Sequence, residues 1–149
     1  MTRRRTLEKN ILFLGMDQSC SGQMAEAIAK KLAPPDTRIF SAALVPRDVP
    51  PAAIEVMKEV EVEMPTERAK ALDSVPMDHI DLVVALGATP RNGAWPALPP
   101  NARLVHWSIP DTRVANSDPP LRSMLRFVRD EIDRWVAALF LDHWRNLTH

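Results

Sequence analysis

The residues best suited to chemistry lie in a short loop, residues 15–21, between an apolar run and a helical pattern. A strand, a tight loop and a helix form an anion site when backbone N–H groups converge beneath the helix N-terminus. A cysteine at the head of such a loop would be held as a thiolate, and an arginine at its tail could grip two oxygens of an oxyanion. This loop is therefore the first place to look for a functional site.

Cys20 is the only cysteine of the chain and lies near the end of this loop. With one thiol no intramolecular disulfide can form, which fits a reducing compartment. A thiol close to a helix N-terminus can be reactive, so Cys20 could be oxidised or act as a displaced nucleophile. The simpler interpretation, which we favour, is a small buried residue that packs beneath the loop.

The histidines do not indicate a metal site. They are scattered along the chain, at His79, His106, His143 and His149. None has the spacing to a cysteine or to another histidine that zinc ligands show. We therefore predict no metal and no cofactor, and we interpret His106 as a packed, hydrogen-bonded residue of a strand.

The elements that position the loop alternate between short apolar runs and helical patterns, which is typical of βαβ units around a parallel sheet. Strands are predicted at residues 11–14, 38–43, 81–86 and 103–107. Helices are predicted over residues 22–32, from Pro50-Pro51 with the inner face Ile54, Met57 and Val60, and over residues 121–144. Loops are predicted at residues 88–100 and 111–120.

This pattern predicts an α/β fold of three layers: a four-stranded parallel sheet with helices on both faces, because right-handed crossovers place helices on both sides. Ligands in such sheets bind beyond the carboxyl ends of the strands. The loop after the first strand lies at that edge. Trp107 and Trp135 are predicted to be core residues. Trp95 is predicted to form a ligand wall, a contact surface or a buried lid.

Length and charge narrow the class of protein. The 149 residues fit one compact domain, which we place at residues 10–149 after a flexible segment of residues 1–9. Nineteen basic residues balance nineteen acidic ones, so no net field favours nucleic acid. No apolar stretch approaches the ~20 residues that a membrane helix needs. We expect a cytoplasmic protein of bacterial type that binds neither nucleic acid nor membrane.

Several motifs, in order along the chain, resemble one known family. Residues 11–29, ILFLGMDQSCSGQMAEAIA, are similar to the start of the low-molecular-weight protein tyrosine phosphatases and the related thioredoxin-coupled arsenate reductases. The likeness continues at residues 40–42 and 53–59, and it favours the arsenate reductase branch at residues 82–86, 98–101 and 106–107. It covers residues 10–140 and implies a four-stranded parallel sheet flanked by helices.

The resemblance also shows where the chain departs from the family's Cys-x5-Arg loop. Gly15 stands at the position of the nucleophilic cysteine, and Ser21 stands at that of the arginine. Glycine offers no nucleophile, and serine cannot replace a bidentate guanidinium. Asp17 and Gln18 replace the loop's glycine and asparagine, and the carboxylate of Asp17 would repel an oxyanion.

At other positions the chain either keeps or replaces the residue type of the family. Ser19 and Cys20 keep the family's residue types, although Cys20 matches the second cysteine and not the nucleophile. Asp111 aligns with the general acid, and we interpret it as an Asp that caps a turn. The reductase branch also has a pair of redox cysteines. Their positions correspond here to Gly87 and to Ala94 or Trp95, none of which carries sulfur.

These losses lead us to predict a non-catalytic binding or interaction protein, whose partner is an unknown small ligand or protein. Its ligand site would consist of Met16, Asp17, Gln18, Ser19, Cys20, Ser21, Trp95 and Asp111. Two alternatives stay open. One is an active tyrosine phosphatase or arsenate reductase that uses Cys20, and the other is a thiol redox sensor that acts through Cys20.

The last predicted helix carries two sets of apolar residues. The main stripe steps by three and four, as an inward face should: Leu121, Met124, Leu125, Val128, Ile132, Trp135, Val136 and Leu139. A second set comprises Phe127, Phe140, Leu141 and Trp144. Because some of these must point away from the core, we predict a homodimer through this helix.

Overall fold

The computed structural model describes residues 9–16, 20–45, 47–64, 70–87, 96–110 and 120–147, without the side chains of residue 120 and of residues 142–147. Its centre is a four-stranded parallel sheet in the order β2-β1-β3-β4. The strands are β1 (Asn10–Gly15), β2 (Arg38–Ala43), β3 (Leu82–Leu86) and β4 (Arg103–Trp107). The predicted α/β fold is confirmed, and the bounds of β2 and β4 match the predicted ones.

The two central strands carry the apolar runs that a parallel sheet buries on both faces. Every residue of β3 is buried, as are the residues of β1 from Ile11 onward. The edge strands are more exposed, and in β4 only Trp107 is buried. In the register, Gly15 pairs with Leu86 and Leu86 pairs with Trp107, so these three strands end side by side.

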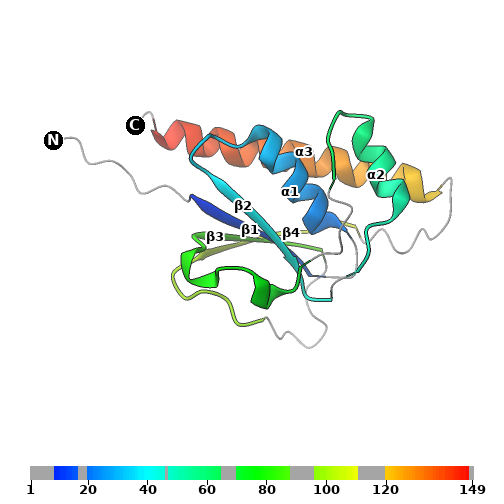
Figure 1. Cartoon of the computed structure of the whole chain (residues 1–149). Coiled ribbons are helices and arrows are strands. Elements are labelled where there is room, and N and C mark those ends of the chain that lie inside the picture. Colours follow the sequence, from blue (N-terminus) through cyan, green and yellow to red (C-terminus); the bar gives the residue numbers. More distant parts are fainter. Residues whose placement is uncertain are drawn as a thin grey trace.

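Three α-helices cover one face of the sheet (Figure 1). They are α1 (Ser21–Leu32), α2 (Pro51–Lys58) and α3 (Pro120–Leu147). The opposite face carries two short 3-10 helices, η1 (Leu72–Ser74) and η2 (Met77–His79), whose residues pack against a second apolar cluster with Leu12, Leu14 and Val83. A 3-10 helix of one turn has no periodicity to read, and these two were not predicted.

The predicted inner face of α2 needs correction. Met57 is buried and Ile54 is half-buried, but Val60 lies beyond the last residue of the helix and is exposed. The residues that α2 buries besides Met57 are Ala52, Ala53 and Val56. The prediction for Val60 was wrong because the helix ends at Lys58, two residues before the pattern would place Val60 on the inner face.

The inward stripe of α3 is confirmed. Its residues are buried or half-buried in the main core: Leu121, Met124, Leu125, Val128, Ile132, Trp135, Val136 and Leu139. Of the second apolar set, Phe140 is buried in the same core, which the prediction did not anticipate, whereas Phe127 and Leu141 are about half exposed. The side chain of Trp144 lies outside the described residues.

Ion pairs hold α2 against α3. Arg126 makes a two-pronged contact with Glu59, at 3.0 Å from Nε to Oε1 and 2.8 Å from Nη2 to Oε2. The Nη1 of Arg129 lies 2.9 Å from the same Oε1. One turn earlier on both helices, Arg122 pairs with Glu55. Fork-shaped pairing of this kind gives geometric specificity, so it fixes how the two helices sit on each other.

This arrangement shifts two acid–base equilibria. Hydrogen bonds from Arg126 and then from Arg129 lower the pKa of Glu59 from 4.5 to about 2. Burial alone would lower the pKa of Arg129, but hydrogen bonds to Asp130 and Glu59 outweigh it and raise that pKa. Arg129 is nearly buried, and it also donates to the carbonyl oxygen of Val56 at 2.9 Å. Its charge is therefore satisfied on α2 as well as on its own helix.

Within the described residues, no helix is long and apolar enough to span a membrane. In that same part of the chain, His, Cys, Asp and Glu side chains do not gather in groups of three or more that could hold a metal ion.

Candidate functional site

The carboxyl ends of three strands are tied together by backbone hydrogen bonds. Met16 donates its N–H to the carbonyl oxygen of Leu86 at 2.8 Å, and Gly87 donates to that of Trp107 at 3.1 Å. Gly87 has a φ of 108°, a conformation that side chains rarely adopt. These bonds fix the rim from which the loop after β1 departs. This rim is where a ligand of a parallel α/β protein is expected.

Cys20 is the residue at the N-terminus of α1, just beyond this rim. It occupies the N-cap position, and its carbonyl oxygen accepts the N–H of Met24 at 3.0 Å. The first turn of α1 carries no acidic residue, and the last turn carries Lys30 and Lys31, so the positive end of the helix dipole at Cys20 is not neutralised by a carboxylate of its own turn. Such a position favours a thiolate or a bound anion.

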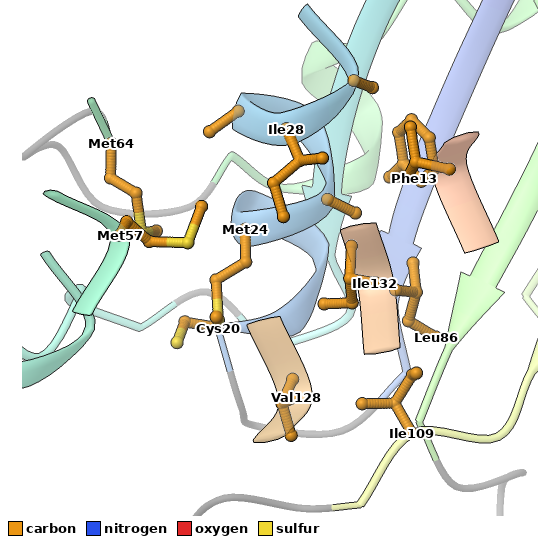
Figure 2. Packing of buried hydrophobic residues seen from close by; sticks show 14 of the residues in the cluster. Phe13, Cys20, Met24, Ile28, Met57, Met64, Leu86, Ile109, Val128 and Ile132 are labelled. Carbon is orange, nitrogen blue, oxygen red and sulfur yellow. The ribbon is translucent and has the colours of Figure 1, made fainter. Parts of the chain in front are cut away.

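Cys20 is also part of the hydrophobic core. Its exposed fraction is 6%. Figure 2 shows it at the start of α1, one turn before Met24, on the side of the helix that faces Met57 and Met64. The thiol therefore combines two features that the sequence suggested separately, a place at a helix N-terminus and a buried, apolar surrounding.

The start of α1 lies very close to the end of β1. A Cβ added to Gly22 would lie 3.1 Å from the amide nitrogen of Gly15 and 3.4 Å from its Cα. At Gly15 itself an added Cβ would meet nothing nearer than 3.8 Å. The close approach therefore favours glycine at position 22, whereas position 15 has room for a Cβ atom. Ser21 follows Cys20 and is 1% exposed, so it is buried beside this contact.

The motif Gln23-Met24-Ala25-Glu26 anchors the helix. Met24 and Ala25 are fully buried, and Gln23 is 6% exposed. Glu26 accepts a hydrogen bond of 2.7 Å from the hydroxyl of Ser41 on β2, and its other oxygen lies 3.1 Å from Nζ of Lys30. The motif thus holds α1 to both the core and the neighbouring strand. The bond between Glu26 and Ser41 was not predicted, because residues on different elements give no spacing signal.

His106 and Trp107 end β4 beside the same rim. The Nε2 of His106 lies 2.6 Å from the carbonyl oxygen of Gly87, so the histidine is hydrogen-bonded as predicted, but it is exposed and not packed. Trp107 is buried as predicted, with its ring centroid 6.0 Å from that of Phe13 and 5.4 Å from that of Trp135. Trp107 therefore links the sheet to α3 beneath the site.

The structure brings together only part of the predicted site. Gly15 and Met16 lie at the end of β1, and Cys20 and Ser21 lie at the start of α1, whose Gly22 approaches Gly15. The side chains of Met16 and Cys20 pack in different apolar clusters, so they do not share one pocket. The remaining predicted residues lie outside the described residues: Asp17, Gln18, Ser19, Trp95 and Asp111. Their roles therefore stay predictions.

The fold and this junction define a class of protein: parallel α/β proteins that carry a thiol at a helix N-terminus beyond the carboxyl ends of the strands. The sequence model described as low molecular weight phosphotyrosine protein phosphatase matches residues 10–143. The chain belongs to this family.

Two relatives with similar sequences are named arsenate reductases. Arsenate reductase 1 of Staphylococcus haemolyticus (strain JCSC1435) is 35% identical over 131 residues, which is 87% of this chain and 92% of the relative. Arsenate reductase 1 of Bacillus cereus (strain ATCC 10987 / NRS 248) is 35% identical over 125 residues, which is 84% of this chain and 89% of the relative. The chain is thus similar to arsenate reductases over nearly their whole length.

Solved structures agree. An arsenate reductase in its reduced state has a TM-score of 0.69 at 25% identity and covers 90% of this chain and 98% of its own. A low molecular weight protein tyrosine phosphatase from T. tengcongensis shares the fold, with a TM-score of 0.69 at 19% identity, over 89% of this chain and 98% of its own.

These comparisons correct our prediction of a non-catalytic protein, which was wrong: relatives at 35% identity are named arsenate reductases. The prediction rested on the residue type at one position of the loop. The prediction treated the missing sulfur at Gly15 as the loss of the site's chemistry. Yet the same loop delivers a thiol to the N-terminus of α1, a few residues further along the chain.

Proposed function

We propose that the protein is an arsenate reductase in which Cys20 supplies the attacking thiol. The observation that carries the proposal is the position of Cys20, the only cysteine of the sequence, at the N-cap of α1. A helix N-terminus stabilises both a thiolate and an approaching oxyanion. The similarity to arsenate reductases supports this chemistry over others that a thiol could perform.

The reaction begins at the Cys20 sulfur. The thiol attacks the arsenic of dihydrogen arsenate, an S–As bond forms, and one oxygen leaves as water with the thiol proton and a proton of the arsenate. A second thiol then attacks the Cys20 sulfur. As the new S–S bond forms, the electron pair of the S–As bond stays on arsenic, which leaves as arsenite and takes up the proton of the second thiol. Arsenic is reduced by two electrons, and two thiols are oxidised to one disulfide.

The second thiol comes from outside the chain, because the sequence holds one cysteine. A small-molecule thiol or the cysteine of a partner reductase would satisfy this requirement. The product on the enzyme is then a mixed disulfide at Cys20, which a further thiol must resolve. A reducing compartment would supply both thiols, and for that reason we also propose that the protein works in the cytoplasm.

The test measures arsenite formed by purified protein from arsenate, with glutathione or with thioredoxin and its reductase as the thiol source. We expect turnover in the native protein, and we expect Cys20→Ser to fall to the rate of the thiol alone. Met64→Leu is a matched control, since it alters a buried sulfur of the same cluster but leaves the thiol in place. Mass spectrometry after turnover should find one glutathione on Cys20.

Two outcomes would overturn the proposal. One is arsenite formation that persists in Cys20→Ser, and the other is a native protein that forms none with either thiol source. Thermal melting of both variants checks that a lost activity is not a lost fold. An aryl phosphate in place of arsenate, hydrolysed at a comparable rate, would assign the site to phosphoryl transfer instead.

A further inference from the structure

A separate cavity of about 450 Å³ opens at the amino ends of the strands, the opposite end of the sheet from Cys20. Asn10 and Arg38, which line it, are the first residues of β1 and β2. The other lining residues are Lys9, Asp36, Phe40, Pro76 and His79. A volume of this size suits a small organic ligand.

The backbone around the cavity is fixed by hydrogen bonds. The carboxylate of Asp81 accepts the N–H groups of Lys9 and Asn10 at 3.0 and 2.9 Å. The side-chain amide of Asn10 donates to the carbonyl oxygen of His79 at 2.7 Å, and Arg38 donates its N–H to the carbonyl oxygen of Lys9 at 2.6 Å. The walls are thus tied to β1 on both sides, so the cavity is formed before any ligand arrives.

The charges that line the cavity are mainly basic. Lys9, Arg38 and His79 contribute two cationic side chains and an imidazole, against one carboxylate, that of Asp36. Within the described residues, none of these three basic side chains is ion-paired with a carboxylate. By contrast, Arg122, Arg126 and Arg129 of α3 are paired with Glu55 or Glu59.

The apolar part of the lining consists of two rings. Phe40 is half-buried and packs against the apolar cluster of that face of the sheet, and Pro76 adds a ring with few degrees of freedom. An aromatic group can stack on such residues at a low cost in conformational entropy. A guanidinium at the rim offers paired N–H donors to a phosphate.

We propose that this cavity binds a small anion that carries a planar aromatic group, of the class of aryl phosphates. The anionic group lies between Lys9 and Arg38, and the ring lies on Phe40 and Pro76. The site is independent of the proposed reductase chemistry, since it lies at the other end of the sheet from Cys20. Its ligand is therefore not the arsenate that reacts there.

The experiment is a titration of the full-length protein with phenyl phosphate, followed by amide chemical shifts. We expect saturable shifts at Asn10, Arg38 and His79, with a Kd on the order of 1 mM or tighter. Inorganic phosphate and benzyl alcohol each lack one half of the ligand, and each should bind at least ~5-fold more weakly. The amides of Gly15 and Gly22 report separately on binding near Cys20.

Arg38→Gln should weaken the cavity binding of phenyl phosphate by about 5- to 10-fold, and Lys9→Gln should weaken it by a smaller factor. Lys70→Gln, at an exposed lysine outside the cavity, should leave it unchanged. Shifts confined to Gly15 and Gly22 would overturn the proposal, as would equal affinity for inorganic phosphate or unchanged affinity in both Arg38→Gln and Lys9→Gln. Because Arg38 and Lys9 are exposed, both variants should fold.

Discussion

Gly22 of α1 lies so close to Gly15 of β1 that a single added carbon would sit 3.1 Å from the Gly15 amide nitrogen. This contact joins the helix that carries Cys20 to the strand that leads into the loop. The atom on the far side of the contact is backbone and not a flexible side chain. It can yield only if β1 or α1 moves.

The first prediction follows from that contact. Gly22→Ala should lower the free energy of unfolding by about 1 kcal/mol, because the strain of overpacking exceeds what alanine gains in helix propensity. Gly15→Ala is the matched control, since its Cβ has 3.8 Å of room, and it should be neutral within ~0.5 kcal/mol. Urea unfolding of both variants measures the difference. Equal stabilities would show that the helix and strand are not held as close as described.

The second prediction concerns Glu61, which has a φ of 60° although it is not glycine. It follows α2 in a Schellman motif, in which Glu61 donates to the carbonyl oxygen of Lys58 at 3.0 Å and Val62 donates to that of Met57 at 3.0 Å. Glu61→Gly should raise the free energy of unfolding by about 0.5–1 kcal/mol, because glycine adopts this conformation without strain. Thermal unfolding measures the gain. Glu61→Ala removes the carboxylate but keeps the strained backbone, so it should show no such gain.

The third prediction is a pH dependence from Glu59. Its pKa is lowered to about 2 in the folded protein by Arg126 and Arg129, so the folded state favours the ionised carboxylate. The resulting stabilisation is fully present above pH 4.5 and is lost as the pH falls toward 2. Glu59→Gln should therefore lower the Tm at pH 7, and the difference from the native protein should shrink as the pH falls from 4.5.

Glu63→Gln provides the comparison for this prediction, because it removes an exposed carboxylate of the same region outside the pairing with Arg126 and Arg129. Its Tm should follow that of the native protein across this pH range. A Glu59→Gln variant whose deficit stays constant down to pH 2 would contradict the assigned pairing.

The fourth prediction is the homodimer through α3. Phe127 and Leu141 expose 53% and 50% of their surface on that helix, whereas Phe140 is already buried in the protein's own core. We expect a dimer in size-exclusion chromatography with light scattering at micromolar concentration, and we expect Phe127→Ser with Leu141→Ser to shift it to monomer. A native protein that elutes as a monomer would contradict the predicted homodimer.

The sequence predicted the structure best where an apolar pattern extended over a whole strand or several helical turns. Continuous apolar runs located β1 and β3, and steps of three and four located the buried stripe of α3. The family resemblance supplied the order of these elements and the position of the loop. Contacts between residues far apart in the sequence were not predicted. One example is the hydrogen bond from Ser41 to Glu26, which depends on how α1 lies against β2.

Two local features were also beyond sequence reasoning. The end of α2 was misjudged because a left-handed residue after a helix is expected to be glycine, and here it is Glu61. At the candidate site, the sequence identified Cys20 as the only thiol but offered burial and reactivity as alternatives. The structure places Cys20 at a helix N-terminus and within the hydrophobic core, so burial is confirmed and reactivity stays a proposal.

The burial of Cys20 has a consequence for the lifetime of the protein. Any group attached to its sulfur must find space among the side chains that stabilise the fold, since only 6% of the residue reaches solvent. We therefore expect a molecule whose Cys20 sulfur carries an added group to unfold more readily than an unmodified one. Inactivated copies would thus be marked for proteolysis by their own instability, without a dedicated recognition signal.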